Sequence, residues 1–204
     1  TTGLLVLDRE DGNGESWLPV SLSDDPERPS DFVTSLRFDR QGRLWVGTNG
    51  DGLFVREEDQ WRPITETAVF TGATIIAMVE QLEGSLWFGT FNGLVQRRPG
   101  SGNDSSAWRV FETADGLPSQ RIQALFVDSK DQLWVGTDKG LGVLSRAGWK
   151  IYTTQNSALP ANDVRALTEA ADGALWIGTW ASGIGELKPD TGEWRVLTVA
   201  DGLV

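Results

Sequence analysis

The chain of 204 residues contains neither cysteine nor histidine. The missing cysteine excludes disulfides, thiolate nucleophiles and cysteine-type zinc sites. The missing histidine excludes a Ser–His catalytic pair, a histidine general base and histidine metal ligands. The sequence also has no Gly-x-Ser-x-Gly turn and no phosphate-binding glycine loop with lysine. We therefore expect a non-catalytic protein without a metal or cofactor.

Long apolar stretches and clusters of basic residues are absent as well. No apolar run approaches the ~20 residues needed to span a membrane, and no basic run exceeds the pair Arg97-Arg98. Eighteen Lys and Arg residues against 29 Asp and Glu residues give a net charge of −11. So acidic a chain is repelled by nucleic-acid phosphates and by anionic membrane surfaces. We expect no nucleic-acid partner and no direct membrane contact from this segment.

Tryptophan and glycine, by contrast, are abundant, with 10 and 24 residues. The tryptophans mark an internal repeat, because a string of Leu, Trp, an apolar residue, Gly and Thr occurs four times. The four copies are Leu44–Thr48, Leu86–Thr90, Leu133–Thr137 and Leu175–Thr179. They begin 42, 47 and 42 residues apart, an interval typical of the four-stranded blades of a β-propeller.

Further positions recur around each string. A β-branched residue precedes the leucine by eleven positions, a small residue precedes it by nine, and a residue that tolerates a positive φ precedes it by two. A glycine and then a second tryptophan follow. These columns are Val33, Ile75, Ile122 and Val164; Ser35, Ala77, Ala124 and Ala166; Gly42, Gly84, Asp131 and Gly173; Gly52, Gly93, Gly140 and Gly183; and Trp61, Trp108, Trp149 and Trp194. Each repeat therefore predicts four antiparallel strands in chain order, with nothing of helical period.

The strand formed by each string is expected to be buried on both faces. Leu44 and Val46 point to one face and Trp45 to the other, so neither face is polar. Tandem sheets that are buried on both faces favour stacking as propeller blades, with the tryptophans in the core. We expect the glycine of each string, such as Gly47, to leave room for a neighbouring aromatic ring.

The predicted fold is therefore an all-β propeller of four-stranded antiparallel blades, with about four and a half blades present. We expect a partial blade at residues 1–22, complete blades at 31–64, 73–111, 120–152 and 162–197, and a link to a further blade at 198–204. The partial blade lacks its first two strands, and the end of the given sequence does not supply them. We therefore predict that the chain is part of a larger propeller. Closure of this chain alone into a ring of four or five blades is the alternative.

Three motifs in the repeats and in the links between them carry a family resemblance. They are Asp39-Arg-Gln-Gly42-Arg-Leu44-Trp45-Val46-Gly47-Thr48, Trp108-Arg-Val-Phe111 and Asp115-Gly116-Leu117-Pro118. They resemble the two-component regulator propeller repeat. In that family such repeats build β-propellers in the periplasmic sensor region of hybrid histidine kinases and in other bacterial surface proteins. Gln81 and Ala170 replace the aspartate of the Asp-x-x-Gly turn in two repeats; as turn residues, they leave the predicted fold unchanged.

The candidate site lies in loops that the repeat does not need. Hairpins between second and third strands share one end of a propeller with the links between blades, and pockets often form there. The hairpins contribute Asn49, Asp51, Phe91, Asn92, Asp138, Lys139, Trp180 and Ser182, and the links contribute Asp31, Gln120, Arg121, Asn162 and Asp163. Trp180 is the one tryptophan out of register. With Phe91 it would suit stacking on a sugar ring or gripping a peptide; a loop aromatic that covers a neighbouring blade is the alternative.

The resemblance and these loops together predict a non-catalytic, extracytoplasmic domain, periplasmic or extracellular, of a bacterial signalling protein. It would sense or bind a small molecule, a glycan or a peptide, and further blades or other proteins would be its partners. The first residues lack the basic start and apolar core of a signal peptide, so any such signal would lie outside this segment.

Two other functions remain open at this stage. One is a protein-protein interaction scaffold in a bacterial surface or secreted protein. The other is a polysaccharide hydrolase or lyase that works with paired carboxylates. Streptogramin lyases have similar Trp-rich blades, but their reaction relies on histidine, which this chain lacks.

Overall fold

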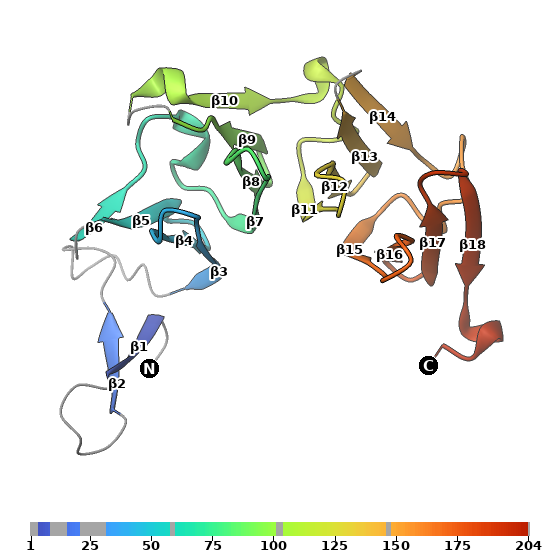
Figure 1. Ribbon diagram of the computed structural model, residues 1–204, viewed down its shortest axis with the longest axis horizontal. Coiled ribbons are helices and arrows are strands. Elements are labelled where there is room, and N and C mark those ends of the chain that lie inside the picture. Colours follow the sequence, from blue (N-terminus) through green and yellow to red (C-terminus); the bar gives the residue numbers. More distant parts are fainter. Residues whose placement is uncertain are drawn as a thin grey trace. The chain divides into compact units, whose positions relative to one another are not determined.

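The computed structural model describes residues 4–8, 16–20, 32–57, 60–100, 104–145 and 148–203. The chain falls into two compact units, residues 1–75 and 76–204. Strands dominate both units, and the described helices are 3-10 turns of three residues. Every four-stranded sheet is an antiparallel meander whose strands follow one another in chain order (Figure 1). The predicted all-β propeller class is confirmed.

The first unit contains, within its described residues, a two-stranded hairpin and one complete four-stranded sheet. Its elements are β1 (Leu4–Asp8), β2 (Ser16–Val20), β3 (Val33–Phe38), β4 (Leu44–Thr48), β5 (Leu53–Glu57), β6 (Gln60–Pro63) and the turn η1 (Ala68–Phe70). The β1–β2 hairpin lies within the predicted partial blade. Of that blade, residues 1–3, 9–15 and 21–22 lie outside the described residues.

The second unit contains three complete sheets in its described part, drawn from green to red in Figure 1. Their strands are β7 (Ile75–Glu80), β8 (Leu86–Thr90), β9 (Gly93–Arg97), β10 (Trp108–Phe111), β11 (Ile122–Val127), β12 (Leu133–Thr137), β13 (Gly140–Ser145), β14 (Gly148–Tyr152), β15 (Val164–Glu169), β16 (Leu175–Thr179), β17 (Ile184–Lys188) and β18 (Glu193–Leu197). The 3-10 turns are η2 (Ser105–Ala107), η3 (Thr113–Asp115) and η4 (Val199–Asp201). The division between the units falls directly after Ile75, the first residue of β7.

The core of the second unit lies between neighbouring sheets, because the second strands bury both faces as predicted. Every residue of β8 and β12 is buried, and Trp87 and Trp134 are each 1% exposed. One apolar cluster joins Trp87 and Phe111 of one sheet to Ile122 of the next. Burying one indole removes ~150–250 Å² from water, a gain on the order of 5 kcal/mol before the entropy of ordering.

The turn before each string has the backbone that the sequence predicts. The φ angle is 79° at Gly42, 92° at Gly84, 63° at Asp131 and 82° at Gly173. Asp131 is the one non-glycine residue in this column, and aspartate is among the residues that best tolerate the left-handed region.

The aspartate of the Asp-x-x-Gly turn also holds the buried indole six residues later. The Trp45 N–H donates to Asp39 Oδ2 at 2.8 Å, and the Trp134 N–H donates to Asp128 Oδ2 at 2.7 Å. A buried indole N–H needs such an acceptor. The aspartate therefore serves the buried indole as well as the turn.

The two repeats that lack this aspartate behave differently from one another. Gln81 accepts the hydrogen bond from the Trp87 N–H at 2.8 Å, so glutamine preserves the contact. Ala170 offers no side-chain acceptor, and Trp176 of the same repeat is only partly buried, unlike Trp134. The substitution thus coincides with a looser setting of the indole.

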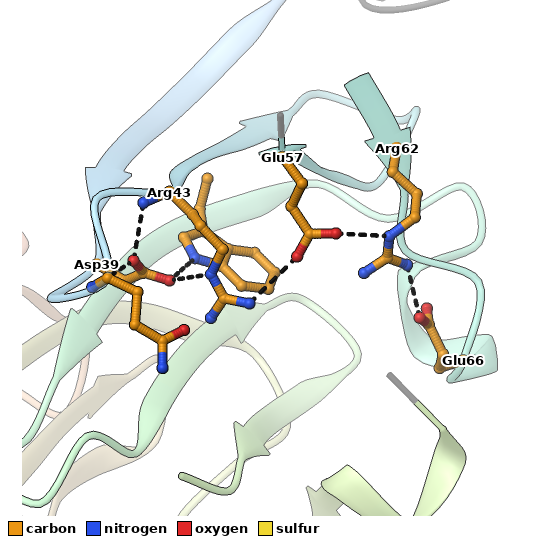
Figure 2. A network of polar contacts seen from close by, with 7 residues as sticks. Asp39, Arg43, Glu57, Arg62 and Glu66 are labelled. Atoms are coloured by element: carbon orange, nitrogen blue, oxygen red, sulfur yellow. Dashed lines mark hydrogen bonds and ion pairs between the residues drawn. The ribbon is translucent and has the colours of Figure 1, made fainter. Parts of the chain in front are cut away.

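In the first unit the turn aspartate begins a row of charged side chains (Figure 2). Arg43 Nε lies 2.7 Å from Asp39 Oδ2, and Arg43 Nη1 lies 3.2 Å from Glu57 Oε1. Arg62 then contacts Glu57 at 3.4 Å and Glu66 at 2.6 Å. Burial raises the pKa of the Asp39 carboxyl, but hydrogen bonds from the indole and from the Arg43 backbone and guanidinium outweigh it and lower the net pKa. The carboxylate is therefore held in its charged form.

The glycines of the second and third strings pack against the next sheet, but not against a ring. A Cβ added at Gly89 would lie 2.6 Å from Ile122 Cγ2, and one at Gly136 would lie 2.8 Å from Val164 Cγ1. Ile122 and Val164 begin the first strands of the following sheets. The prediction of an aromatic neighbour is wrong, because the space is filled by the branched carbons that a β-branched residue carries close to its backbone.

Candidate ligand-binding site

One end of the sheets in the second unit gathers most of the candidate residues. We call it the hairpin end; it comprises the hairpins at 91–92, 138–139 and 180–183 and the leading segments 120–123 and 162–165. Ile122 pairs with Thr137, and Val164 pairs with Thr179. Because of this register, each leading segment arrives beside the hairpin of its own sheet.

Arg121 and Phe91 form a contact between two neighbouring sheets at this end. The guanidinium carbon of Arg121 lies 4.4 Å from the centre of the Phe91 ring, which is 39% exposed. No carboxylate of the described residues lies within ion-pair distance of Arg121. A guanidinium stacked on a ring keeps its N–H donors available in its own plane. Arg121 is therefore placed to receive an anionic group.

Arg165 and Trp180 form a similar stack in the last sheet. The guanidinium carbon of Arg165 lies 4.9 Å from the centre of the Trp180 ring, and the indole is 65% exposed. Here the guanidinium also forms an ion pair with a carboxylate: its Nε and Nη2 donate hydrogen bonds to Asp163 at 2.7 and 2.9 Å. The Trp180 backbone N–H donates to the Asp163 carbonyl at 2.8 Å. Among the described residues no ring contact joins Trp180 to Phe91, so each aromatic pairs with its own arginine.

Electrostatic interactions connect these two stacks. The hydrogen bond from Arg165 lowers the pKa of Asp163, and the Gln123 amide and the Arg121 charge lower it further. The hydrogen bond to Asp163 raises the pKa of Arg165, as do the charges of Asp163 and Asp138. The charged forms of Asp163 and Arg165 are therefore favoured, and charges of the neighbouring sheet act on both groups.

Two side chains of this group have buried polar atoms without a hydrogen-bond partner. Gln123 is 9% exposed, and neither its Oε1 nor its Nε2 has a partner among the described residues. The Gln123 amide lies beside the Asp163 carboxylate but not in hydrogen-bonding geometry. Oδ1 of Asp138 is likewise buried and unpartnered. Each such group costs ~1–3 kcal/mol, so a bound water, ion or ligand is the usual explanation.

The remaining predicted site residues lie elsewhere or make structural contacts. Asn49 accepts from Thr74 Oγ1 at 2.7 Å, and the Asp51 backbone binds a threonine hydroxyl; both residues belong to the first unit. Asn162 accepts from the Thr154 backbone at 2.8 Å. Asn92, Lys139 and Ser182 are exposed in their hairpins, Gln120 is partly buried, and Asp31 lies outside the described residues.

Gln123 and Arg165 were not singled out from the sequence. They occupy the same position of the repeat, between the constant β-branched and small columns, where the other two repeats have Thr34 and Ile76. This variability is visible in the sequence: the residue type at this position differs among the four repeats, whereas the positions directly before and after it keep theirs.

A concave region lies toward the opposite end of the same unit. It is a cleft of about 990 Å³ between the sheet of β7–β10 and the sheet of β11–β14. Its lining includes Phe111, Trp149, Arg109 and Lys130. Arg109 stacks on Phe111 at 4.2 Å, and Lys130 forms an ion pair with Asp190. Arg109 and Lys130 therefore already have partners within the protein, whereas the hairpin end has buried polar atoms without partners.

Two further features bear on the chemistry of the chain. Within the described residues, no cluster of three or more aspartates and glutamates is arranged to hold a metal ion. No helix in the described part of the chain is long and apolar enough to cross a membrane.

The comparison with protein families identifies the repeats. Residues 27–50, 116–139 and 158–181 match the family described as two component regulator propeller. The chain contains two-component regulator propeller repeats. Each matched segment runs through a link, a first strand, the Asp-x-x-Gly turn or its variant, and the Leu-Trp string. The resemblance inferred from the sequence motifs is confirmed.

The relatives of the chain include a histidine kinase and the extracellular domain of a two-component system. Histidine kinase P4 of Formosa agariphila is 29% identical over 178 residues, which are 80% of this chain and 13% of the kinase. The extracellular domain of the hybrid two-component system BT3049 from B. thetaiotaomicron is 28% identical, with a TM-score of 0.69. That match covers 85% of this chain and 23% of the domain. The chain therefore spans less than a quarter of either relative.

The propeller fold extends to proteins with other activities. Virginiamycin B lyase from Staphylococcus aureus is 16% identical, with a TM-score of 0.63, over 95% of this chain and 61% of the lyase. At this identity the likeness concerns the fold alone, because one fold supports many functions.

Proposed function

We propose that this chain is a non-catalytic, extracytoplasmic ligand-binding domain of a bacterial signalling protein, and that the ligand binds at the hairpin end. The proposal is supported by the two-component relatives, one of which is an extracellular domain. The single observation that carries the site is the pair of buried, unpartnered groups on Gln123 and Asp138 beside two exposed aromatic rings. A small-molecule, glycan or peptide ligand would supply the missing partners and shift the packing of the domain in its protein.

The carboxyl groups favour binding over hydrolysis. A glycosidase needs one carboxyl with a raised pKa to act as general acid. The described carboxyls with shifted pKa values, Asp39, Asp104 and Asp163, are all shifted downward. The S. aureus virginiamycin B lyase is inactivated when a histidine is replaced by alanine, and this chain has no histidine.

A binding screen tests the proposal. Purified protein is screened by thermal shift against oligosaccharides, short peptides and polar small molecules, and hits are titrated by calorimetry. We expect at least one hit whose binding is weakened by about tenfold or more in Trp180→Ala. Leu82→Ala is the matched control, because both side chains are 65% exposed and Leu82 lies in the β7–β8 turn, away from the hairpin end. Turnover of a bound oligosaccharide, or hits that ignore Trp180, would contradict the proposal.

A further inference from the structure

At the hairpin end, the protein's own contacts leave a specific set of groups without partners. Arg165 and Asp163 neutralise one another through two hydrogen bonds of 2.7 and 2.9 Å. Arg121, by contrast, has a ring under its guanidinium but no ion pair among the described residues. Asp138 has a buried carboxylate oxygen with no donor. One positive and one negative group of this end thus have no direct ion-pair partner among the described residues, although Asp138 and Arg121 act at longer range on Arg165 and Asp163.

These two charges without a direct ion pair belong to the same pair of strands. Arg121 directly precedes β11 and Asp138 directly follows β12, and the last paired residues of these strands are Ile122 and Thr137. Arg121 turns to the Phe91 ring of the preceding sheet instead of pairing with Asp138. Gln123 adds a buried amide from the same leading segment, with two N–H donors and one acceptor unused. The site therefore offers an anion, a cation and a neutral amide within one short stretch.

Simple ligands match this set to different degrees. A neutral sugar would supply hydroxyl groups but would leave both charges without an ion-pair partner. An anion would satisfy Arg121 but would meet the like charge of Asp138, and a cation would do the reverse. A ligand with an ammonium group and a carboxylate close together matches both charges, and the Gln123 amide can donate to the carboxylate and accept from the ammonium.

We propose that the hairpin end binds a small zwitterion of the α-amino-acid type, with its ammonium on Asp138, its carboxylate on Arg121 and an apolar side chain against Phe91. The inference rests on the proposed function, because it names the ligand class for the same site. The ring is 39% exposed, so it retains apolar surface for the side chain of the ligand. Desolvated charge-assisted hydrogen bonds of this kind are the strong ones in proteins.

The test is calorimetric titration of the chain with L-phenylalanine and L-leucine. N-acetyl-L-phenylalanine, L-phenylalanine amide and glucose serve as probes that lack the ammonium, the carboxylate or both charges. We expect the free amino acids to bind, and each single-charge analogue to bind at least about tenfold more weakly. Glucose is expected to bind more weakly still.

Matched variants assign each charge of the ligand to its residue. Asp138→Asn and Arg121→Gln should each weaken amino-acid binding by about 10- to 100-fold, with the acetylated probe indifferent to the first and the amide indifferent to the second. Asp172→Asn and Arg195→Gln, at exposed positions away from the hairpin end, should leave binding unchanged. Gln123→Met should weaken binding while the melting temperature stays equal or rises, because it removes buried polar atoms that have no partner. A fold defect would lower that temperature.

The outcomes separate this inference from the function on which it rests. Binding of amino acids that depends on Asp138 and Arg121 supports both. Failure of every amino acid, while a sugar or a peptide binds through Trp180, overturns the zwitterion but leaves the binding domain intact. Failure of all probes and of the wider screen overturns both proposals. The buried polar atoms of Gln123 and Asp138 would then be explained by hydrogen bonds to ordered water.

Discussion

At one end of the second unit, Asp128 accepts hydrogen bonds from the Trp134 indole and from the backbone of Lys130 and Gln132, at 2.7 to 3.0 Å. At the other end, Asp138 keeps a buried oxygen without a partner. The two aspartates lie at opposite ends of β12, one in the turn before this strand and one in the hairpin after it. In this sheet the aspartate that recurs in the sequence has its hydrogen bonds satisfied, whereas the aspartate at a variable hairpin position does not. Repetition therefore marks residues that build the blade, and variation marks residues that are free to serve a ligand.

Two tryptophans give the largest expected contrast between these ends. Trp134→Ala should lower the free energy of unfolding by about 3–5 kcal/mol, because it empties a site that is 1% exposed. Trp180→Ala should change it by no more than about 0.5 kcal/mol, because the indole is 65% exposed. Urea titration followed by circular dichroism measures both. Comparable losses in the two variants would mean that Trp180 belongs to the core rather than to a site.

The two aspartates give the next contrast. Asp128→Ala should cost about 1–3 kcal/mol, because it leaves the buried Trp134 indole N–H without its acceptor. Asp138→Ala should leave stability unchanged or raise it, because it removes a buried oxygen that has no donor. The same urea titration applies. A loss at Asp138 equal to that at Asp128 would show that the hairpin carboxylate is structural.

The sequence predicted the blades because blade-building residues recur. Spacing alone located the second strand of each sheet, its burial on both faces and the left-handed turn that ends at Asp131, where φ is 63°. It did not reveal that Gly89 faces Ile122 of the next sheet or that Asp128 holds an indole. Those contacts join residues through space, and a periodic pattern gives position in the repeat rather than partner.

The candidate site was predicted only in part for a related physical reason. Phe91, Arg121, Asp138 and Trp180 were identified from their loops, and the structure places them at one end of the second unit. Gln123 was missed because a strand position normally points to core or to solvent, and only coordinates show that its amide is buried without a partner. Whether these residues bind the ligand stays a prediction, as does the number of blades in the complete ring.

The repeat that contains Ala170 has no side-chain acceptor for its indole N–H, so a substitution there should stabilise the protein. Ala170 stands where the other repeats have aspartate or glutamine, and Trp176 is only partly buried. Ala170→Asp should add the missing hydrogen bond to the indole and raise the free energy of unfolding by about 0.5–1.5 kcal/mol. Ala170→Leu, which adds bulk without an acceptor, is the control. No gain with aspartate, or an equal gain with leucine, would show that the indole bond does not set the stability of this sheet.

Acid titration probes the hairpin end with the smallest expected effect. The pKa of Asp163 is lowered by its hydrogen bond to Arg165, so its charged form stabilises the fold above the ordinary carboxyl pKa of 3.8. That contribution is lost as the pH falls through the lowered value. Between about pH 5 and pH 2.5 the melting temperature of the wild type should therefore fall more steeply than that of Asp163→Asn, by a few degrees at most because the pair is exposed to solvent. Asp172→Asn, in an exposed turn, is the control and should show the same fall of melting temperature with pH as the wild type. If Asp163→Asn also shows the wild-type fall, the Arg165–Asp163 pair contributes nothing to folding. Its geometry is then available to be changed by a ligand.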